Sequence, residues 1–347
     1  MPPTSPTSPR PLINPAFFDF WAGQINPLWT WDRPRARLLA RRPEGARATT
    51  LVLQANRHWR GSRAGQHVEL GVDIDGRRLR RHYSPTVLGD RRLEITVHNV
   101  SGGRVSPYLA ERARIGEVFE LGQAFGEMVL PRDPSPPLLL LAAGSGITPM
   151  RSLLREWAAR ERGATGEATL MYWSRHRDAV CFENEWTALA ASAGVRVVHW
   201  ITGEGAPRID ALSDDQWGEL GGRHVMACGP GGFAQAAAAR LAGRVASFQA
   251  EAFSPAAAIG TEEGEVEVEL ARSGRRLRLP RALSLLEGLE AQGLKPRHGC
   301  RMGICNTCAC QRRSGATRHL PSGERHDEPA TVRLCVHAPS TDLVLDL

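Results

Sequence analysis

Residues 34–133 alternate between apolar and polar side chains in short runs. Glycine and proline residues separate these runs, which include Arg37 to Leu39, Thr49 to Leu53, His67 to Val72 and Leu93 to His98. Alternation with a period of two is typical of strands that bury one face. The pattern therefore predicts a small antiparallel β-barrel.

A continuous apolar run follows a proline-rich hinge at 131–137. Residues 138–143 read Leu-Leu-Leu-Leu-Ala-Ala, which is typical of a strand buried on both faces of a parallel sheet. Further strands are predicted at 168–173, 195–201 and 224–227, with helical segments among them. This alternation of strand and helix predicts a doubly wound α/β sheet.

Short alternating runs return towards the C-terminus. Val266, Val268 and Leu270 alternate, and a Ser-Gly turn leads to a second strand through 277–279. A helix is predicted over 284–290 and a closing strand over 343–347. The predicted organisation is an N-terminal extension (1–33), a barrel (34–134), an α/β domain (135–253), a linker (254–262) and a C-terminal α+β domain (263–347).

Four of the seven cysteines have the spacing of metal ligands. Cys300, Cys305 and Cys308 follow the pattern C-x4-C-x2-C, and Cys335 lies further on. This is the ligand spacing of a plant-type [2Fe–2S] cluster. A structural zinc site would more usually show two C-x2-C pairs, and only one is present. Disulfides are disfavoured because the cysteine count is odd and nothing upstream indicates secretion.

Composition is that of an ordinary globular protein, with 42% hydrophobic and 23% charged residues. No apolar run approaches the roughly 18 residues that span a bilayer. The N-terminus lacks the features of a signal peptide, so a cytoplasmic location is expected. The net charge of +7 comes almost entirely from scattered arginines. Scattered arginines without interleaved aromatics do not indicate nucleic-acid binding.

An aromatic-rich segment precedes the barrel. It contains Phe-Phe-Asp-Phe-Trp at 17–21 and Trp-Thr-Trp at 29–31. One interpretation is that this segment packs back on its own protein. The other is that it docks on a partner or at the surface of a membrane.

Several motifs together resemble the ferredoxin-reductase superfamily of flavin/[2Fe–2S] oxidoreductases. The barrel region holds Arg-His-Tyr-Ser at 81–84 and Gly-Gly-Arg-Val-Ser at 102–106. The α/β region holds Gly-Ser-Gly-Ile-Thr-Pro at 144–149 and Cys-Gly-Pro at 228–230. The cysteine loop and its surroundings look like a plant-type ferredoxin. The resemblance covers nearly all of the chain after residue 34.

The resemblance implies a multidomain fold and three cofactors. The fold would be an antiparallel β-barrel flavin domain, a doubly wound α/β nucleotide domain and a C-terminal α+β ferredoxin (β-grasp) domain. The cofactors would be FAD, a [2Fe–2S] cluster and NADPH. FMN stays open as the flavin and NADH as the donor. NADPH is favoured because the second strand of the α/β domain ends in Ser174 and Arg175 and not in an acidic residue.

The resemblance also assigns residues to roles. Ser84 would lie near the flavin N5, Cys228 over the nicotinamide, and Glu251 near the flavin, where it assists proton transfer. These three are the predicted catalytic residues. The glycine-rich turns would bring backbone N–H groups to phosphates. The predicted cofactor-binding residues are Arg81, His82, Tyr83, Ser84, His98, Gly103, Arg104, Val105, Ser106, Gly144, Gly146, Thr148, Pro149, Ser174, Arg175, Cys228, Gly229 and Pro230. The predicted cluster ligands are Cys300, Cys305, Cys308 and Cys335.

The implied function is electron transfer. A hydride donor delivers two electrons at once and a [2Fe–2S] cluster accepts one, so a flavin would stand between them. The implied partner is a terminal oxygenase or a membrane fatty-acid desaturase, with peripheral membrane contact through the aromatic segment. A redox sensor or passive electron carrier without nucleotide turnover is the alternative from another class.

Overall fold

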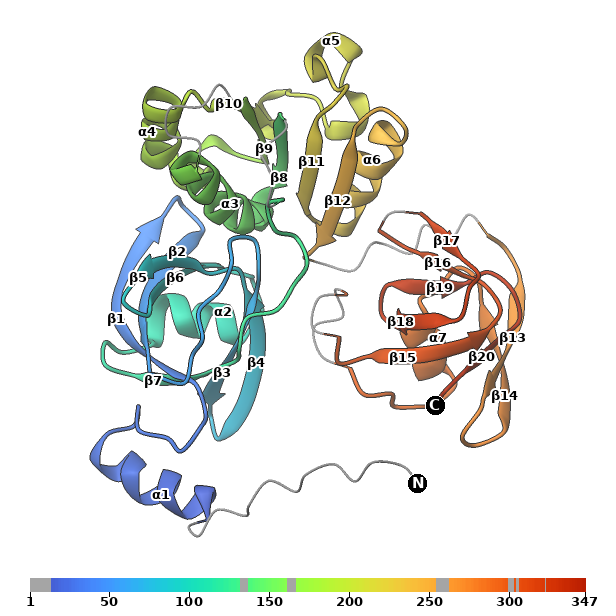
Figure 1. Cartoon of the computed structure of the whole chain (residues 1–347), viewed down its shortest axis with the longest axis horizontal. Helices are drawn as coiled ribbons and strands as arrows, with labels where there is room; N and C mark the ends of the chain where they lie inside the picture. Colours follow the sequence, from blue (N-terminus) through green and yellow to red (C-terminus); the bar gives the residue numbers. More distant parts are fainter. Residues whose placement is uncertain are drawn as a thin grey trace, which may run out of the picture.

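The computed structural model describes residues 14–131, 137–160, 167–253, 262–298, 303, 306–321 and 323–347. The predicted linker, apart from its last residue, and two of the predicted cluster ligands, Cys300 and Cys305, lie outside the described residues. Three sheet-based domains follow one another along the chain, and a separate N-terminal helix lies at the far end of the barrel from the nucleotide-type domain (Figure 1).

The first domain is a seven-stranded antiparallel sheet in the order β4-β3-β7-β1-β2-β6-β5. Its inward-facing side chains form one apolar cluster that includes Leu38, Leu53 and Ile95. A short helix, α2 (Val105–Pro107), and a π-helix, η1 (Tyr108–Arg112), follow the last long strand. The strands are β1 (Arg35–Glu44), β2 (Ala48–Ala55), β3 (Val68–Ile74), β4 (Arg77–Tyr83), β5 (Thr86–Gly89), β6 (Arg92–His98) and β7 (Val118–Leu121).

The second domain is a parallel sheet in the order β10-β9-β8-β11-β12. Every residue of β8 and of β9 is buried, as the continuous apolar run at 138–143 predicts. The strands are β8 (Leu138–Ala143), β9 (Ala168–Ser174), β10 (Arg196–Ile201), β11 (His224–Gly229) and β12 (Ser247–Ala252). The helices are α3 (Ile147–Arg160), α4 (Glu183–Ala193), α5 (Asp214–Trp217) and α6 (Gly231–Leu241), with 3-10 turns η2 (Gly144–Gly146), η3 (Arg177–Ala179), η4 (Thr202–Glu204) and η5 (Ile209–Ala211).

The strand order of the second domain fixes where a ligand can bind. The connection from β8 leads to β9 on one side, while β11 lies on the other side of β8. Ligands of open α/β sheets bind at such a switch point, beyond the carboxyl ends of the strands. The turns at 144–149 and 228–230 both lie there.

The third domain is a mixed five-stranded sheet in the order β14-β13-β20-β15-β18, with a three-stranded sheet in the order β17-β16-β19. The helix α7 (Leu285–Ala291) begins at Ser284, which forms a reciprocal capping box with Glu287. Leu285, Leu286 and Leu289 of this helix are buried in the domain core. The strands are β13 (Glu265–Leu270), β14 (Arg275–Pro280), β15 (Ala309–Ser314), β16 (Thr317–His319), β17 (Arg325–His326), β18 (Ala330–Arg333), β19 (His337–Pro339) and β20 (Leu343–Leu345).

The predicted fold class is thus confirmed in its three parts. Several elements were not predicted, among them the helix α1 (Pro15–Ile25) in the aromatic N-terminal segment. None of the described helices is long and apolar enough to cross a bilayer.

Candidate active site

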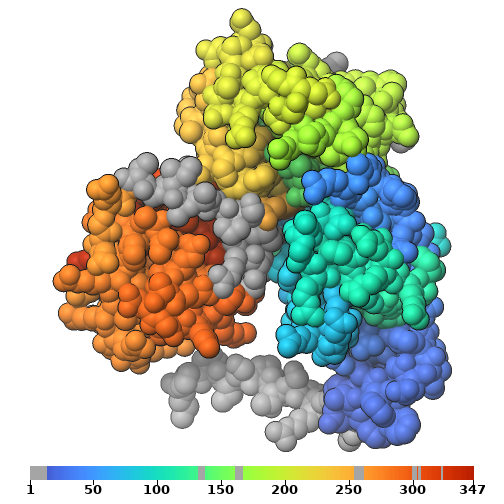
Figure 2. Space-filling view, turned by 180° about the vertical axis from the view of Figure 1, so that it is seen from behind, coloured from blue at the N-terminus to red at the C-terminus, as the bar shows by residue number. Residues whose placement is uncertain are grey.

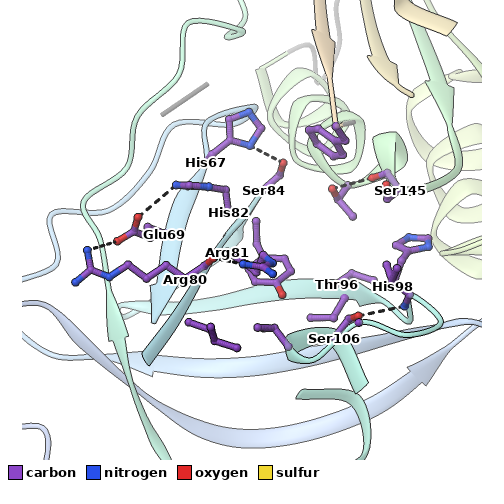
Figure 3. Close-up of a pocket in the computed structure, with 18 of the residues that line it drawn as sticks. His67, Glu69, Arg80, Arg81, His82, Ser84, Thr96, His98, Ser106 and Ser145 are labelled. Carbon is purple, nitrogen blue, oxygen red and sulfur yellow. Dashed lines mark hydrogen bonds and ion pairs between the residues drawn. The ribbon is translucent and has the colours of Figure 1, made fainter. Parts of the chain in front are cut away.

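A cavity of about 930 Å³ opens on the side of the barrel that faces the other two domains. Its walls come mainly from β4, β6 and the turn before α2 (Figure 3). Ser145, Thr148 and Phe253 of the second domain also line it, as do His298 and Thr307 of the third. The cavity is therefore the place where all three domains meet.

Most of the predicted flavin-binding residues line this cavity. They are Arg81, His82, Tyr83, Ser84, His98, Gly103, Arg104, Val105 and Ser106. Ser84 is buried, whereas Arg81 is exposed and donates from Nη1 to the carbonyl oxygen of Arg80 at 2.7 Å. Burial raises the pKa of the Tyr83 hydroxyl and lowers the pKa of His98 to about 4, so both side chains are uncharged near neutral pH.

The glycine-rich turn before α2 is shaped by a close backbone approach. A Cβ added at Gly103 would lie 2.9 Å from the carbonyl oxygen of Val100, so any other residue would force the turn open. The backbone N–H of Val100 donates to the Ser106 hydroxyl at 3.1 Å and closes the turn (Figure 3). The residues of this turn line the cavity at the start of α2, and backbone N–H groups at a helix start suit a phosphate group.

The nucleotide turn of the second domain is equally constrained. A Cβ at Gly146 would lie 1.9 Å from the carbonyl oxygen of Cys228, so only glycine lets the two turns pack against each other. Gly144 has a φ of +54°. Thr148 donates its hydroxyl to the carbonyl oxygen of Ser145 at 3.1 Å. Thr148 and Pro149 lie in the first turn of α3, whose N-terminus is a suitable site for a pyrophosphate.

The structure brings Cys228, Gly229 and Pro230 beside this turn, but these three residues do not line the cavity itself. Cys228 is fully buried, and burial raises the pKa of its thiol well above the usual range. It lies next to Glu251 in the pairing of β11 with β12.

The predicted 2′-phosphate site is only partly available. The Ser174 hydroxyl already donates to the carbonyl oxygen of His176 at 2.9 Å and is buried. Arg175 is exposed, and neighbouring Arg177 pairs with Glu204 at 3.4 Å. Arg175 is therefore the side chain that can turn towards a ribose phosphate.

A hydrogen-bonded chain of three side chains joins the barrel to the second domain, and Figure 3 shows its first link, between Ser84 and His67. The Ser84 hydroxyl lies 3.0 Å from His67 Nδ1, and His67 Nε2 lies 2.5 Å from a carboxylate oxygen of Glu251. The His67 side chain is 1% exposed and the Glu251 side chain 13%. Two of the predicted catalytic residues are thus linked through a histidine that the sequence analysis did not select.

Only half of the predicted cluster site can be described. The sulfurs of Cys308 and Cys335 are 3.3 Å apart and buried. This separation is too long for a disulfide. Two thiolates at about 2.3 Å from one tetrahedral metal would be about 3.8 Å apart, so a small separation of the two sulfurs would let them bind one iron. Arg333 donates from Nη1 to the carbonyl oxygen of Gly303 at 2.6 Å and holds the middle of the cysteine loop.

Three of the cavity residues that were not predicted from the sequence are chemically informative. His67 opens the strand run at 67–72, and nothing in the local pattern distinguishes it from other strand residues. His298 and Thr307 line the cavity; in the sequence His298 lies just before the cysteine loop and Thr307 lies within it. Their positions were a usable signal that the cluster lies close to the flavin.

Comparison with known protein families agrees with this layout. The family described as "Oxidoreductase FAD-binding domain" matches residues 44–129. "Oxidoreductase NAD-binding domain" matches residues 140–239, and "2Fe-2S iron-sulfur cluster binding domain" matches residues 268–340. Fold and site thus define a flavoprotein oxidoreductase whose cofactors are FAD, a nicotinamide nucleotide and a [2Fe–2S] cluster.

The chain belongs to the ferredoxin-reductase superfamily of flavin/[2Fe–2S] oxidoreductases. It is 34% identical to an NADPH oxidoreductase of Mycobacterium tuberculosis over 97% of this chain and 90% of that protein. It is also 34% identical to the ferredoxin reductase component of a 3-ketosteroid-9-alpha-monooxygenase of Mycolicibacterium smegmatis, over 67% of this chain and 69% of that protein. The solved structure of a phthalate dioxygenase reductase shares the fold, with a TM-score of 0.53 and 24% identity over 90% of this chain and 97% of that one.

Proposed function

We propose that this protein takes electrons from NADPH and delivers them, one at a time, to the iron centre of a separate oxygenase or desaturase. The observation that carries the proposal is the shared cavity. Residues of the flavin motif, of the nucleotide turn, of the cysteine loop and of the segment before that loop all line it. When bound, FAD accepts a hydride from a nicotinamide and releases electrons singly to an iron–sulfur centre.

In this proposal the protein positions the cofactors and pairs its charged and N–H groups with their phosphates. Arg81 pairs with a flavin phosphate, and the turn containing Gly103 and Ser106 directs N–H groups to the same group. Gly146 and Thr148 hold the pyrophosphate of the dinucleotide at the start of α3. Because Gly146 packs on the backbone of Cys228, the phosphate end and the nicotinamide end of the nucleotide are fixed by one rigid contact.

The chain Ser84–His67–Glu251 is proposed to hold and move the proton that accompanies flavin reduction and reoxidation. Ser84 presents its hydroxyl to the cavity, and His67 can exchange a proton with it through Nδ1. The Glu251 carboxylate accepts a hydrogen bond from Nε2 at the other end of the imidazole and so orients the ring. This arrangement extends the role expected for Glu251, which contacts the flavin-side serine only through His67.

NADPH is the proposed donor because Arg175 provides a cation at the end of β9, where an NADH enzyme would more often have an acidic residue. Relatives of the chain include a reductase component of a monooxygenase and a vanillate O-demethylase oxidoreductase of a Pseudomonas species. These support an oxygenase as the partner. We propose a membrane fatty-acid desaturase as the alternative partner. The protein would reach it from the cytoplasm at the surface of the membrane.

An anaerobic titration tests this function. The purified protein is titrated with NADPH and separately with NADH, and visible absorbance and low-temperature EPR are recorded. Flavin bleaching followed by a rhombic [2Fe–2S] signal is expected, with NADPH effective at the lower concentration. Bleaching without the EPR signal would remove the cluster from the path. If neither nucleotide bleached the flavin, a sensor or passive carrier would be favoured instead.

A further inference from the structure

The exposed hydrophobic side chains of this protein are concentrated in one place. Among the described residues, eleven large hydrophobic side chains are exposed, and six of them lie between positions 17 and 31. Four belong to α1: Phe17 (62% exposed), Phe20 (59%), Trp21 (56%) and Ile25 (76%). We call these four the aromatic face. Its three rings contact one another, with Trp21 5.2 Å from Phe20 and 6.3 Å from Phe17 between centroids.

The orientation of α1 is the reverse of that of an ordinary surface helix. Such a helix buries its apolar side and exposes its charges. In α1 the single charged residue, Asp19, is buried, and its carboxylate accepts from the backbone N–H of Trp31 at 2.6 Å and pairs with Arg33. Ala22 is buried on the same side. The helix is thus fixed with its aromatic face outward.

Two arginines lie close to the C-terminal end of α1, in a segment whose one exposed acidic residue is Asp32. Arg35 donates to the carbonyl oxygen of Pro27 at 2.8 Å, and Arg37 donates to the side chain of Asn26 at 2.9 Å, immediately after the helix.

A second basic segment lies against the same region. His58 contacts the carbonyl oxygen of Thr30 at 2.9 Å and so holds the start of the loop of residues 56–66 beside it, whereas the other end of this loop is hydrogen-bonded to Ser152 and Glu156 of α3. The start of the loop exposes Arg57.

We propose that α1 is an interfacial anchor that inserts the aromatic face into an anionic phospholipid bilayer. Aromatic side chains are suited to the boundary between headgroups and acyl chains, and adjacent arginines are suited to lipid phosphates. At eleven residues the helix lies in the surface and does not cross it. It projects from the end of the barrel remote from the nucleotide-binding domain, which this docking leaves in water (Figures 1 and 2).

This anchor deepens the membrane contact within the proposed function and rests on that part of it, but its test does not depend on electron transfer. The full-length holoprotein is sedimented with vesicles of phosphatidylcholine alone and of phosphatidylcholine with phosphatidylglycerol. The protein should bind the anionic vesicles more tightly, and salt should weaken this binding. The double variant Phe20→Ser, Trp21→Ser should lose roughly a hundredfold in partitioning, because each side chain contributes at least about tenfold.

A matched control is the double variant Val87→Ser, Leu88→Ser, which removes two side chains that are 40% and 41% exposed on β5. It should bind vesicles like the parent. NADPH-driven reduction of an artificial one-electron acceptor should be unchanged in both variants, so loss of anchoring and loss of reductase function are separable. The proposal fails if the parent does not bind either vesicle, if both double variants bind equally, or if α1 instead mediates self-association in sedimentation velocity without lipid.

Discussion

A buried ion-pair network joins the barrel to the helix that begins at the nucleotide turn, and removing its central arginine should uncouple the two domains. Arg151 of α3 donates to Glu94 of β6 at 2.7 Å and to Glu185 of α4 at 2.7 Å, and its guanidinium lies 4.4 Å from the centre of the Phe182 ring. The side chains of Arg151 and Glu94 are 5% and 4% exposed. The perturbation is Arg151→Met, which keeps the length of the side chain and removes its charge.

The magnitude follows from what the substitution leaves behind. Removing one partner of a buried ion pair costs about 3–5 kcal/mol, because the other charge stays buried. Here Glu94 keeps a second partner, since Arg42 pairs with its other oxygen at 2.8 Å and is half exposed. The free energy of unfolding of the barrel and nucleotide domains should therefore fall by about 3 kcal/mol, the lower end of this range.

The substitution should also slow hydride transfer. Arg151 lies one turn after Thr148, so a shift of α3 against the barrel moves the nucleotide relative to the flavin cavity. A displacement of about 1 Å at a reacting centre can cost about a hundredfold in rate. Stopped-flow reduction of the flavin at varied NADPH concentrations separates the limiting rate from the nucleotide dissociation constant. The rate should fall at least tenfold and the dissociation constant should stay within a few-fold.

Arg155→Met is the matched control on the same helix. Arg155 is 42% exposed and contacts Glu185 at 3.4 Å, so its loss should cost at most about 1 kcal/mol. The double variant Arg151→Met, Glu94→Gln should lose less free energy of unfolding than the two single variants lose in sum, because no buried charge is left unpaired. If Arg151→Met changed stability and rate no more than Arg155→Met, the network would not be what fixes the two domains.

Four further predictions concern the cavity and the cluster. His67→Phe should slow proton-coupled flavin turnover about a hundredfold and abolish its solvent deuterium isotope effect, while flavin binding persists; an unchanged pH profile would remove His67 from the proton path. Cys305→Ser should prevent assembly of the [2Fe–2S] cluster, read by EPR, but leave flavin reduction by NADPH largely intact. Arg175→Ala should weaken NADPH at least tenfold and NADH hardly at all, and equal losses would contradict the 2′-phosphate assignment. Because burial lowers the pKa of His98 to about 4 from 6.5, the unfolded state binds more protons between these values, so stability should fall as pH drops from 6.5 to 4, and His98→Gln should flatten this fall in acid-unfolding curves.

Patterns among residues a few positions apart predicted many strands and helices of the fold and located its sequence motifs. The apolar run at 138–143 predicts a strand buried on both faces, and β8 is fully buried. A helix is predicted over 284–290, and α7 occupies Leu285–Ala291 with Ser284 as its N-cap. These signals are legible because the period of side-chain burial and the satisfaction of helix ends depend on residues a few positions apart.

Contacts between distant segments were decided by the tertiary structure alone. Ser84 and His67 are 17 positions apart, and His67 and Glu251 are 184 apart, yet they form one hydrogen-bonded chain. Arg151 meets Glu94 across 57 positions. No local pattern marks these residues, because each is an ordinary member of its own strand or helix.

In the N-terminal helix, the sequence and the tertiary structure each determined a different property. The sequence supplied its aromatic side chains and left open whether they face the protein or the outside. Their direction was decided by Asp19, whose carboxylate is bound by the backbone of Trp31 and the side chain of Arg33 twelve and fourteen positions later. A buried carboxylate needs such partners, and only the folded chain brings them together, so burial of the one charge turns the aromatic face outward.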